Sequence, residues 1–144
     1  MAEPERLLNE VRTLAGSASR MLIESGRRGD LTEESLGDAD AFLDEVRGAH
    51  HDRELLVVSF GCYLGEVMCA ALDGRWRFSR DEAGVTTAEV CTLGGSRCAP
   101  MGFVAGKLGP EGDYKSLVSL VRGLRELENR EAQRPENLEP PPQG

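Results

Sequence analysis

Residues 55–76 read LLVVSFGCYLGEVMCAALDGRW, and this stretch decides the fold. A helix built from it carries apolar side chains around nearly its whole circumference. Surface helices have a single apolar stripe, whereas a helix that is apolar on all sides belongs inside a core. We therefore predict a central helix that starts near Asp52 and ends at Asp73-Gly74, where the glycine suits the left-handed conformation of a helix terminus.

Glu66 is the one charged residue in residues 55–72 of this helix. An unpaired buried carboxylate would cost several kcal/mol or would take up a proton, so Glu66 needs a partner. Arg75 and the indole N–H of Trp76 follow the helix closely and are candidates, and a backbone N–H of the returning hairpin could also reach the carboxylate. The alternative to such a structural anchor is a general acid or base with a raised pKa. A position in an open cleft, beside a thiol or an imidazole, would favour that alternative and overturn the interpretation as a binding module.

Two further helices precede the central one. Residues 5–25 place apolar side chains at alternating spacings of three and four, and Gly26 ends the pattern. Thr32 is a suitable N-cap for a second helix that ends at Gly48. Within the central helix, Gly61 and Gly65 share a face, which predicts close packing against another element.

The pattern changes to a period of two after Gly74. Trp76 and Phe78 alternate with polar residues, which predicts a strand with one buried face, and residues 86–92 form a second strand. A two-residue turn at Gly94-Gly95 would place Cys91 opposite Cys98. This thiol pair would stay reduced in an intracellular protein, and a disulfide would require an oxidising cell.

The sequence predicts a single α+β domain over residues 1–127. Three N-terminal helices pack on a small antiparallel β-hairpin sheet, and a C-terminal helix, capped by Asp113 and ending at Leu127, closes the domain. Pro100 is assigned to a short or edge strand, and residues 101–108 to a short helix or an irregular return. Residues 128–144 are acidic and rich in proline, which predicts a disordered tail.

Composition argues against several classes of function. A net charge of −8 argues against nucleic-acid binding. No stretch has the length and freedom from charge of a membrane span, and no signal peptide is recognised, so we expect a cytoplasmic protein. The cysteines form no C-x-x-C pair, His50 and His51 are adjacent, and glycine-rich phosphate loops are missing. We therefore expect no metal and no cofactor.

Four short motifs together resemble a group of small bacterial domains of unknown function: YLGE at 63–66, DGRW at 73–76, CAP at 98–100 and KLGPEGDYKSL at 107–117. In that group a Y-L-G-E helix leads through a G-x-x-W element into a hairpin, followed by a proline segment, a K-x-L or R-x-L element and a final helix. The resemblance covers residues 36–127 and implies an α+β domain, with no catalytic residues. Cys98 departs from the pattern, because a polar residue such as Asn commonly precedes the proline segment.

The function that these observations favour is a non-enzymatic interaction protein, such as an adaptor, a dedicated chaperone or an immunity-type partner of another bacterial protein. Fifteen arginines against two lysines indicate a bacterial genome rich in G and C. The first helix has a spacing that could pair with a second copy, giving a homodimer. The alternatives are an enzyme that uses Glu66 or the thiols, and a sensor with a pocket between helix and sheet. The candidate residues are Tyr63, Glu66, Arg75 and Trp76, with Cys91 and Cys98 as the thiol pair.

Overall fold

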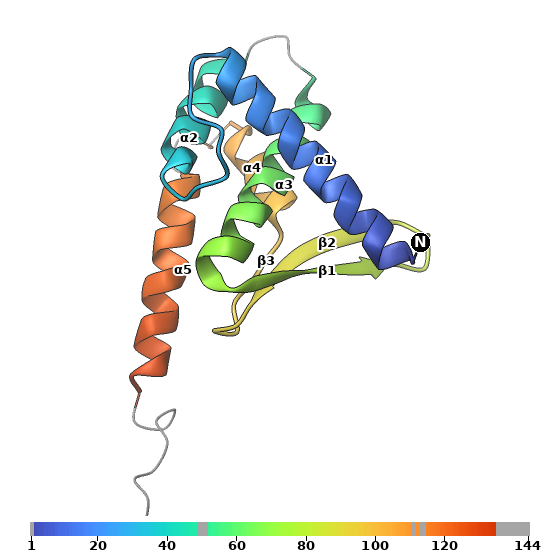
Figure 1. The fold of residues 1–144 in the computed structure, drawn as a ribbon, viewed down its shortest axis with the longest axis vertical. Helices are drawn as coiled ribbons and strands as arrows, with labels where there is room; N and C mark the ends of the chain where they lie inside the picture. Colours follow the sequence, from blue (N-terminus) through green and yellow to red (C-terminus); the bar gives the residue numbers. More distant parts are fainter. Residues whose placement is uncertain (1, 49–51, 111, 113–114, 135–144) are drawn as a thin grey trace, which may run out of the picture.

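The computed structural model describes residues 2–48, 52–110, 112 and 115–134. It contains five helices and a three-stranded antiparallel sheet, 62% helix and 13% strand, which confirms the predicted α+β class (Figure 1). The elements are α1 (Glu3–Glu24), α2 (Ser35–Val46), α3 (Arg53–Leu72), β1 (Gly74–Arg80), β2 (Thr86–Thr92), β3 (Arg97–Cys98), α4 (Pro100–Lys107) and α5 (Leu117–Ala132).

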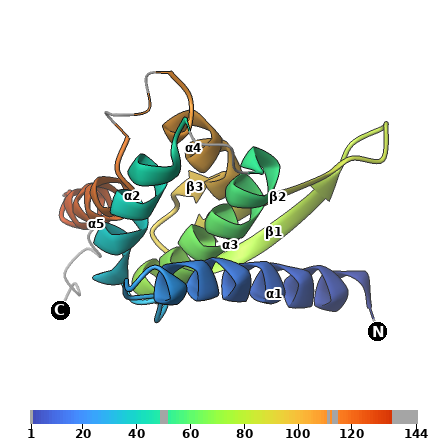
Figure 2. The same cartoon turned by 90° about the horizontal axis from the view of Figure 1, so that it is seen from above.

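Helix α3 is the core of the molecule, as its all-round apolar sequence predicts. It packs against α1, α4, α5 and both long strands, and Figures 1 and 2 show it at the centre of the fold. Asp52 caps its first turn by accepting a hydrogen bond from the backbone N–H of Leu55. The left-handed residue that ends α3 is Asp73 (φ 51°) rather than Gly74, which is the first residue of β1.

The sheet has the order β1-β2-β3, and α3 covers one of its faces. Trp76 pairs with Val90 on that face, while Arg75 and Arg77 lie on the opposite, exposed face. Gly74 must lack a side chain, because a Cβ atom there would lie 2.8 Å from a methyl group of Val90. The alternation predicted for the strand with Trp76 and Phe78 is confirmed, and β2 spans the predicted residues 86–92.

The predicted turn at Gly94-Gly95 is wrong by one residue. Three residues form the loop between Thr92 and Ser96, and Gly95 adopts a positive φ of 96°. As a result, Cys98 pairs with Val90, and Cys91 pairs with Arg97. A slip of one residue turns a side chain to the other face of the sheet, so the two cysteines face away from each other and form no thiol pair. All four cysteines are free.

The chain after β3 differs from the prediction at both ends. Pro100 does not belong to a strand but begins α4, where its missing N–H costs nothing. Helix α5 continues beyond Leu127 to Ala132, and the Glu128 carboxylate accepts a hydrogen bond from Thr92, so the tail does not start at residue 128. The predicted cap Asp113 and residues 135–144 lie outside the described residues.

A buried ion pair joins α2, α4 and α5. The Lys107 ammonium is 2% exposed and lies 3.4 Å from Asp40 and 3.1 Å from Asp44. It also donates a hydrogen bond of 2.7 Å to the carbonyl oxygen of Lys115. Asp40 in turn accepts hydrogen bonds from the N–H groups of Leu117 and Val118, so a side chain of α2 caps the start of α5. This network closes the side of the domain away from α1.

Among the described helices, α3 alone is long and apolar enough to cross a membrane. Most of this stretch, 61%, is buried by the rest of the fold, as expected for the core helix of a soluble protein.

Replacing Lys107 by Met should lower the free energy of unfolding by about 3 kcal/mol, because Asp40 would keep its charge in a site that has lost its cation. Urea unfolding followed by circular dichroism measures this change. The matched control is Arg20→Met, which removes an exposed cation from α1 and should change stability by less than about 0.5 kcal/mol. Equal effects of the two substitutions would contradict the structural role of Lys107.

Candidate functional site

The most promising site is a groove between α1 and β1, which we call the α1–β1 groove. In Figure 2, α1 runs alongside β1, on the side away from β2. A cavity of about 380 Å³ opens here, and Phe78 and Pro4 continue it into a second hollow of about 200 Å³ near the end of β1. The larger cavity is lined by Pro4, Leu8 and Arg12 of α1, Glu66 and Cys69 of α3, and Gly74, Arg75, Trp76 and Phe78 of β1.

Trp76 forms one wall of the groove. Its indole lies against the backbone of α3 at Gly65, where an added Cβ atom would overlap the six-membered ring. On its other side the indole stacks with Phe78, with the ring centroids 6.3 Å apart. Both side chains remain partly exposed, so the groove has an aromatic wall in contact with solvent. The predicted close packing at Gly65 is confirmed, and that at Gly61 is too, against Met101 of α4.

Glu66 lies in the groove and has two polar neighbours. The Trp76 indole N–H donates a long hydrogen bond of 3.5 Å to its carboxylate, and the guanidinium of Arg12 on α1 lies 3.7 Å away. The Glu66 side chain is 19% exposed, so it sits at the edge of the core rather than inside it. Trp76 is therefore a partner as predicted, but Arg75 is not, because its exposed side chain forms no ion pair with Glu66.

Cys69 lies beside Glu66 in the same cavity, one turn further along α3. Burial, followed by the negative charge of Glu66, raises the pKa of the Cys69 thiol to about 11. The same two causes raise the pKa of Cys62, which lies one turn before Glu66, to about 12. Both groups are therefore neutral thiols near pH 7, in an environment that disfavours the nucleophilic thiolate.

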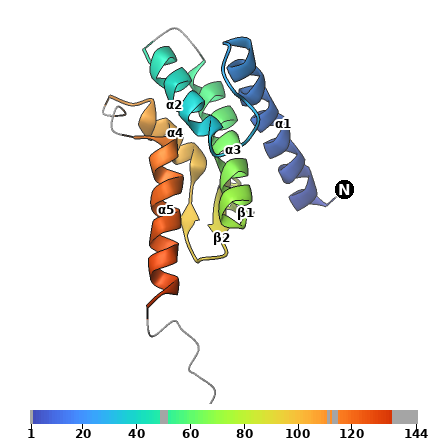
Figure 3. The ribbon, with the colours of Figure 1, turned by 60° about the vertical axis from the view of Figure 1, so that its left-hand side comes forward.

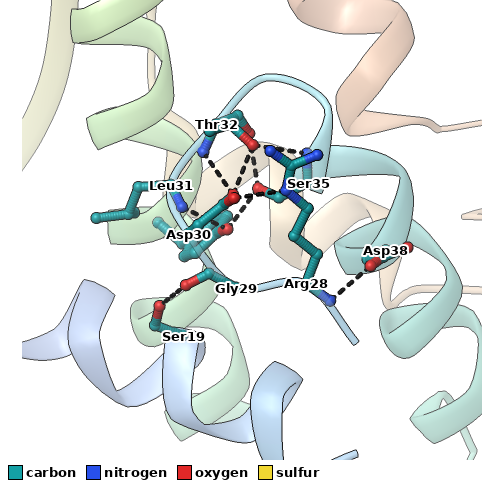
Figure 4. Close-up of polar contacts among 9 residues, drawn as sticks. Ser19, Arg28, Gly29, Asp30, Leu31, Thr32, Ser35 and Asp38 are labelled. Carbon is teal, nitrogen blue, oxygen red and sulfur yellow. Dashed lines mark hydrogen bonds and ion pairs between the residues drawn. The ribbon is translucent and has the colours of Figure 1, made fainter. Parts of the chain in front are cut away.

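Tyr63 is fully buried, and its hydroxyl reaches the loop before α2. Its hydroxyl accepts a hydrogen bond of 3.0 Å from the N–H of Leu31, a residue held at a positive φ of 61°, and it also bonds to Ser35. Figure 4 shows the polar contacts that close this loop, including the bond from Ser19 of α1 to Gly29. Tyr63 is thus a structural residue that fixes α2 on α3.

Cys91 and Cys98 lie apart from the groove. Cys98 packs against the core, and its burial raises the pKa of the thiol. Cys91 is on the opposite face of the sheet, between Arg75 and Arg97 on the neighbouring strands. It borders a hollow of about 750 Å³ that Cys69 also reaches. No group of three metal-binding side chains gathers within the part of the chain that the structure describes.

The contribution of α1 was not predicted from the sequence. Residues Val11, Ala15, Ala18 and Leu22 bury the apolar stripe of α1 within the domain. Pro4 and Leu8 lie before this buried part and line the groove, where Glu3 also pairs with Arg80 of β1, and Figure 3 shows α1 running beside α3. The sequence did contain a signal for this role, because the apolar stripe of α1 continues toward the N-terminus beyond the residues that are buried in the core. The homodimer through this helix stays a prediction.

Comparison with known proteins adds no relatives: no family model matches the chain, and neither does any curated protein or solved structure. The resemblance to the small bacterial domains with the Y-L-G-E helix therefore stays a prediction.

Gly65→Ala should push the Trp76 indole off α3, lowering the free energy of unfolding by about 1–3 kcal/mol. Trp76 is the single tryptophan of the chain, so its fluorescence emission should move to longer wavelength as the ring gains solvent. Gly16→Ala on α1 is the control, because its Cβ atom would meet nothing within 4 Å and the substitution should be neutral or stabilising. An unshifted emission spectrum for Gly65→Ala would contradict the contact.

The rate at which iodoacetamide alkylates Cys69 should rise about tenfold for each pH unit from pH 7 to 9, because the thiolate fraction grows in that proportion below the pKa. Mass spectrometry of the digested protein resolves the rate at this site. In urea the same rate should level off near pH 9, the ordinary value for a thiol. A rate in the native protein that is already level at pH 8 would show a reactive thiolate.

Proposed function

We propose that this chain is a non-enzymatic protein-interaction module, and that the α1–β1 groove receives a segment of another protein. The observation that carries this proposal is the composition of the groove. Its walls are the partly exposed rings of Trp76 and Phe78 and the apolar side chains of α1, with Arg75 at its margin. Aromatic and arginine side chains around an apolar centre are typical of the residues that contribute most to protein binding.

The polar groups of the groove are satisfied in a way that suits binding. Glu66 already has Arg12 and the Trp76 indole as partners, so the groove presents no isolated buried charge to an incoming chain. The two hollows that share Pro4 and Phe78 also give the groove the elongated form that an extended peptide requires.

An enzyme is the second candidate, and one observation favours it. Glu66 and Cys69 line the same open cavity, as a thiol enzyme assisted by a carboxylate would require. This is the position, in an open cleft beside a thiol, that was expected to overturn a binding module. The chemistry argues against an enzyme: with a pKa of about 11, only about one Cys69 side chain in ten thousand carries the thiolate at pH 7. Glu66 raises that pKa instead of lowering it, and the described residues include no imidazole to take the proton.

The test is site-specific photo-crosslinking in the cell that makes the protein. A photoreactive amino acid replaces Leu8, which lines the groove, or Ile23, which is 63% exposed near the other end of α1. We expect one protein to be crosslinked from position 8 and to be absent from position 23. The crosslink should disappear when Phe78→Glu removes part of the aromatic wall.

Equal crosslinks from positions 8 and 23, or none from position 8, would contradict the proposal. The conservative substitutions Glu66→Gln and Cys69→Ser distinguish an interaction module from an enzyme that uses these two side chains. Both variants should keep the crosslink from position 8 and the cellular function, because neither substitution fills the groove. Loss of function with an intact crosslink would favour catalysis.

A further inference from the structure

The backbone groups along the outer edge of β1 bond to no described element, although α1 runs alongside that edge and Glu3 pairs with Arg80 at its end. Leu93 donates its N–H to the carbonyl of Asp73, and Asp81 donates to Val85, so the odd-numbered residues of β1 point their backbone groups toward β2. The N–H and C=O groups of Trp76 and Phe78 therefore point away from β2. No backbone hydrogen bond joins them to another described element. These are the groups to which an added strand would bind.

The two faces of this edge differ in chemistry. On the face that α3 covers, Trp76 and Phe78 meet Pro4 and Leu8 of α1 in the groove. On the opposite face, Arg75 and Arg77 are exposed. A strand added to β1 alternates its side chains in the same way, one toward the aromatic wall and the next toward the arginines.

The two arginines lack acidic partners. Neither Arg75 nor Arg77 forms an ion pair with a described residue, and the cross-strand neighbour of Arg77, Glu89, is bonded at 2.6 Å to Arg97 instead. Other arginines near the groove are paired, Arg12 with Glu66 and Arg80 with Glu3.

We propose that the partner binds by adding a strand to β1, and that this strand alternates apolar with acidic side chains. The inference rests on the proposed function and names the chemistry of its ligand. Main-chain hydrogen bonds to Trp76 and Phe78 supply part of the affinity. Specificity comes from the apolar side chains in the groove and from the acidic ones beside Arg75 and Arg77, as in other cases of strand addition.

A second copy of this chain is the less suitable occupant. Pairing β1 with another β1 would bring the arginines of both copies together on one face, where like charges are destabilising. An acidic strand removes that repulsion and replaces it with attraction. The charge on β1 therefore selects a different chain, and it also blunts the open edge against self-association.

The test uses synthetic nine-residue peptides and the fluorescence of Trp76. A peptide that alternates Val and Glu should bind and change the emission, and its affinity should fall as salt is added. A peptide with the same residues in two blocks should bind at least about tenfold more weakly, because only the alternating pattern fits both faces. N-methylation at every second residue should block binding in one of the two sets and leave it unchanged in the other, since only one set faces β1.

Charge reversal tests the arginines. The double variant Arg75→Glu/Arg77→Glu should bind the Val-Glu peptide about tenfold more weakly and should gain affinity for a Val-Lys peptide. The control Arg20→Glu/Arg122→Glu changes the net charge equally at exposed sites outside the groove and should bind as the unmodified protein does. Circular dichroism and the melting temperature establish that each variant is folded.

Equal binding of the alternating and block peptides, or tolerance of N-methylation in both sets, would overturn the inference. Peptide-independent dimerisation through β1 would overturn it too, in favour of a second copy. If no peptide binds although position 8 still crosslinks its partner, the added strand is wrong and the interaction module stands. Loss of the crosslink from position 8 would overturn the proposed function as an interaction module as well.

Discussion

The contact between the Trp76 indole and the backbone of α3 at Gly65 is the constraint on which the rest of the structure depends. A side chain at position 65 would occupy the volume of the ring. Because the ring lies there, β1 follows α3 directly and turns one face onto it. The orientation of the sheet, the position of β2 and the direction in which the free edge of β1 points all follow from this contact.

The domain treats its charges differently on its two sides. On the side of α5, the buried Lys107 pairs with the mostly buried Asp40 and the half-exposed Asp44, and Asp40 also caps α5. On the side of α1, the pair of Glu66 and Arg12 is looser and borders a cavity. The closed network stabilises the arrangement of helices, and the open pair leaves room beside β1. A stable frame with one incompletely filled side is a physical basis for recognition.

The sequence predicted the elements that local pattern determines. The apolar circumference of α3, the spacing of α1, the alternation in β1 and the span of β2 each depend on side chains near in sequence, and each is confirmed. Trp76 as a partner of Glu66 was also predictable, because both lie close to the end of α3. The register of β2 and β3 was not, since a three-residue loop and a two-residue loop can both be built around Gly94-Gly95.

The contacts between elements that are distant in sequence could not be predicted from the local sequence pattern. Nothing local indicates that Lys107 is buried with two aspartates of α2, or that Arg12 rather than Arg75 faces Glu66. These pairings depend on how α1 and α2 cross α3, which is set by the packing of the whole core. For the same reason the sequence indicated a carboxylate in need of partners but not the groove beside it. That groove needs α1, whose first turns extend past the core.

Hydrogen exchange along β1 in the free protein is the most direct test of the open outer edge, because one side of this strand is paired with β2 and the other side is unpaired. Exchange of the individual amides can be followed by NMR. We expect the N–H groups of Arg75 and Arg77, which face β2, to exchange at least about a hundredfold more slowly than those of Trp76 and Phe78. Uniform protection of all four amides would mean that the outer edge is already covered, and it would contradict a groove that is open to a partner.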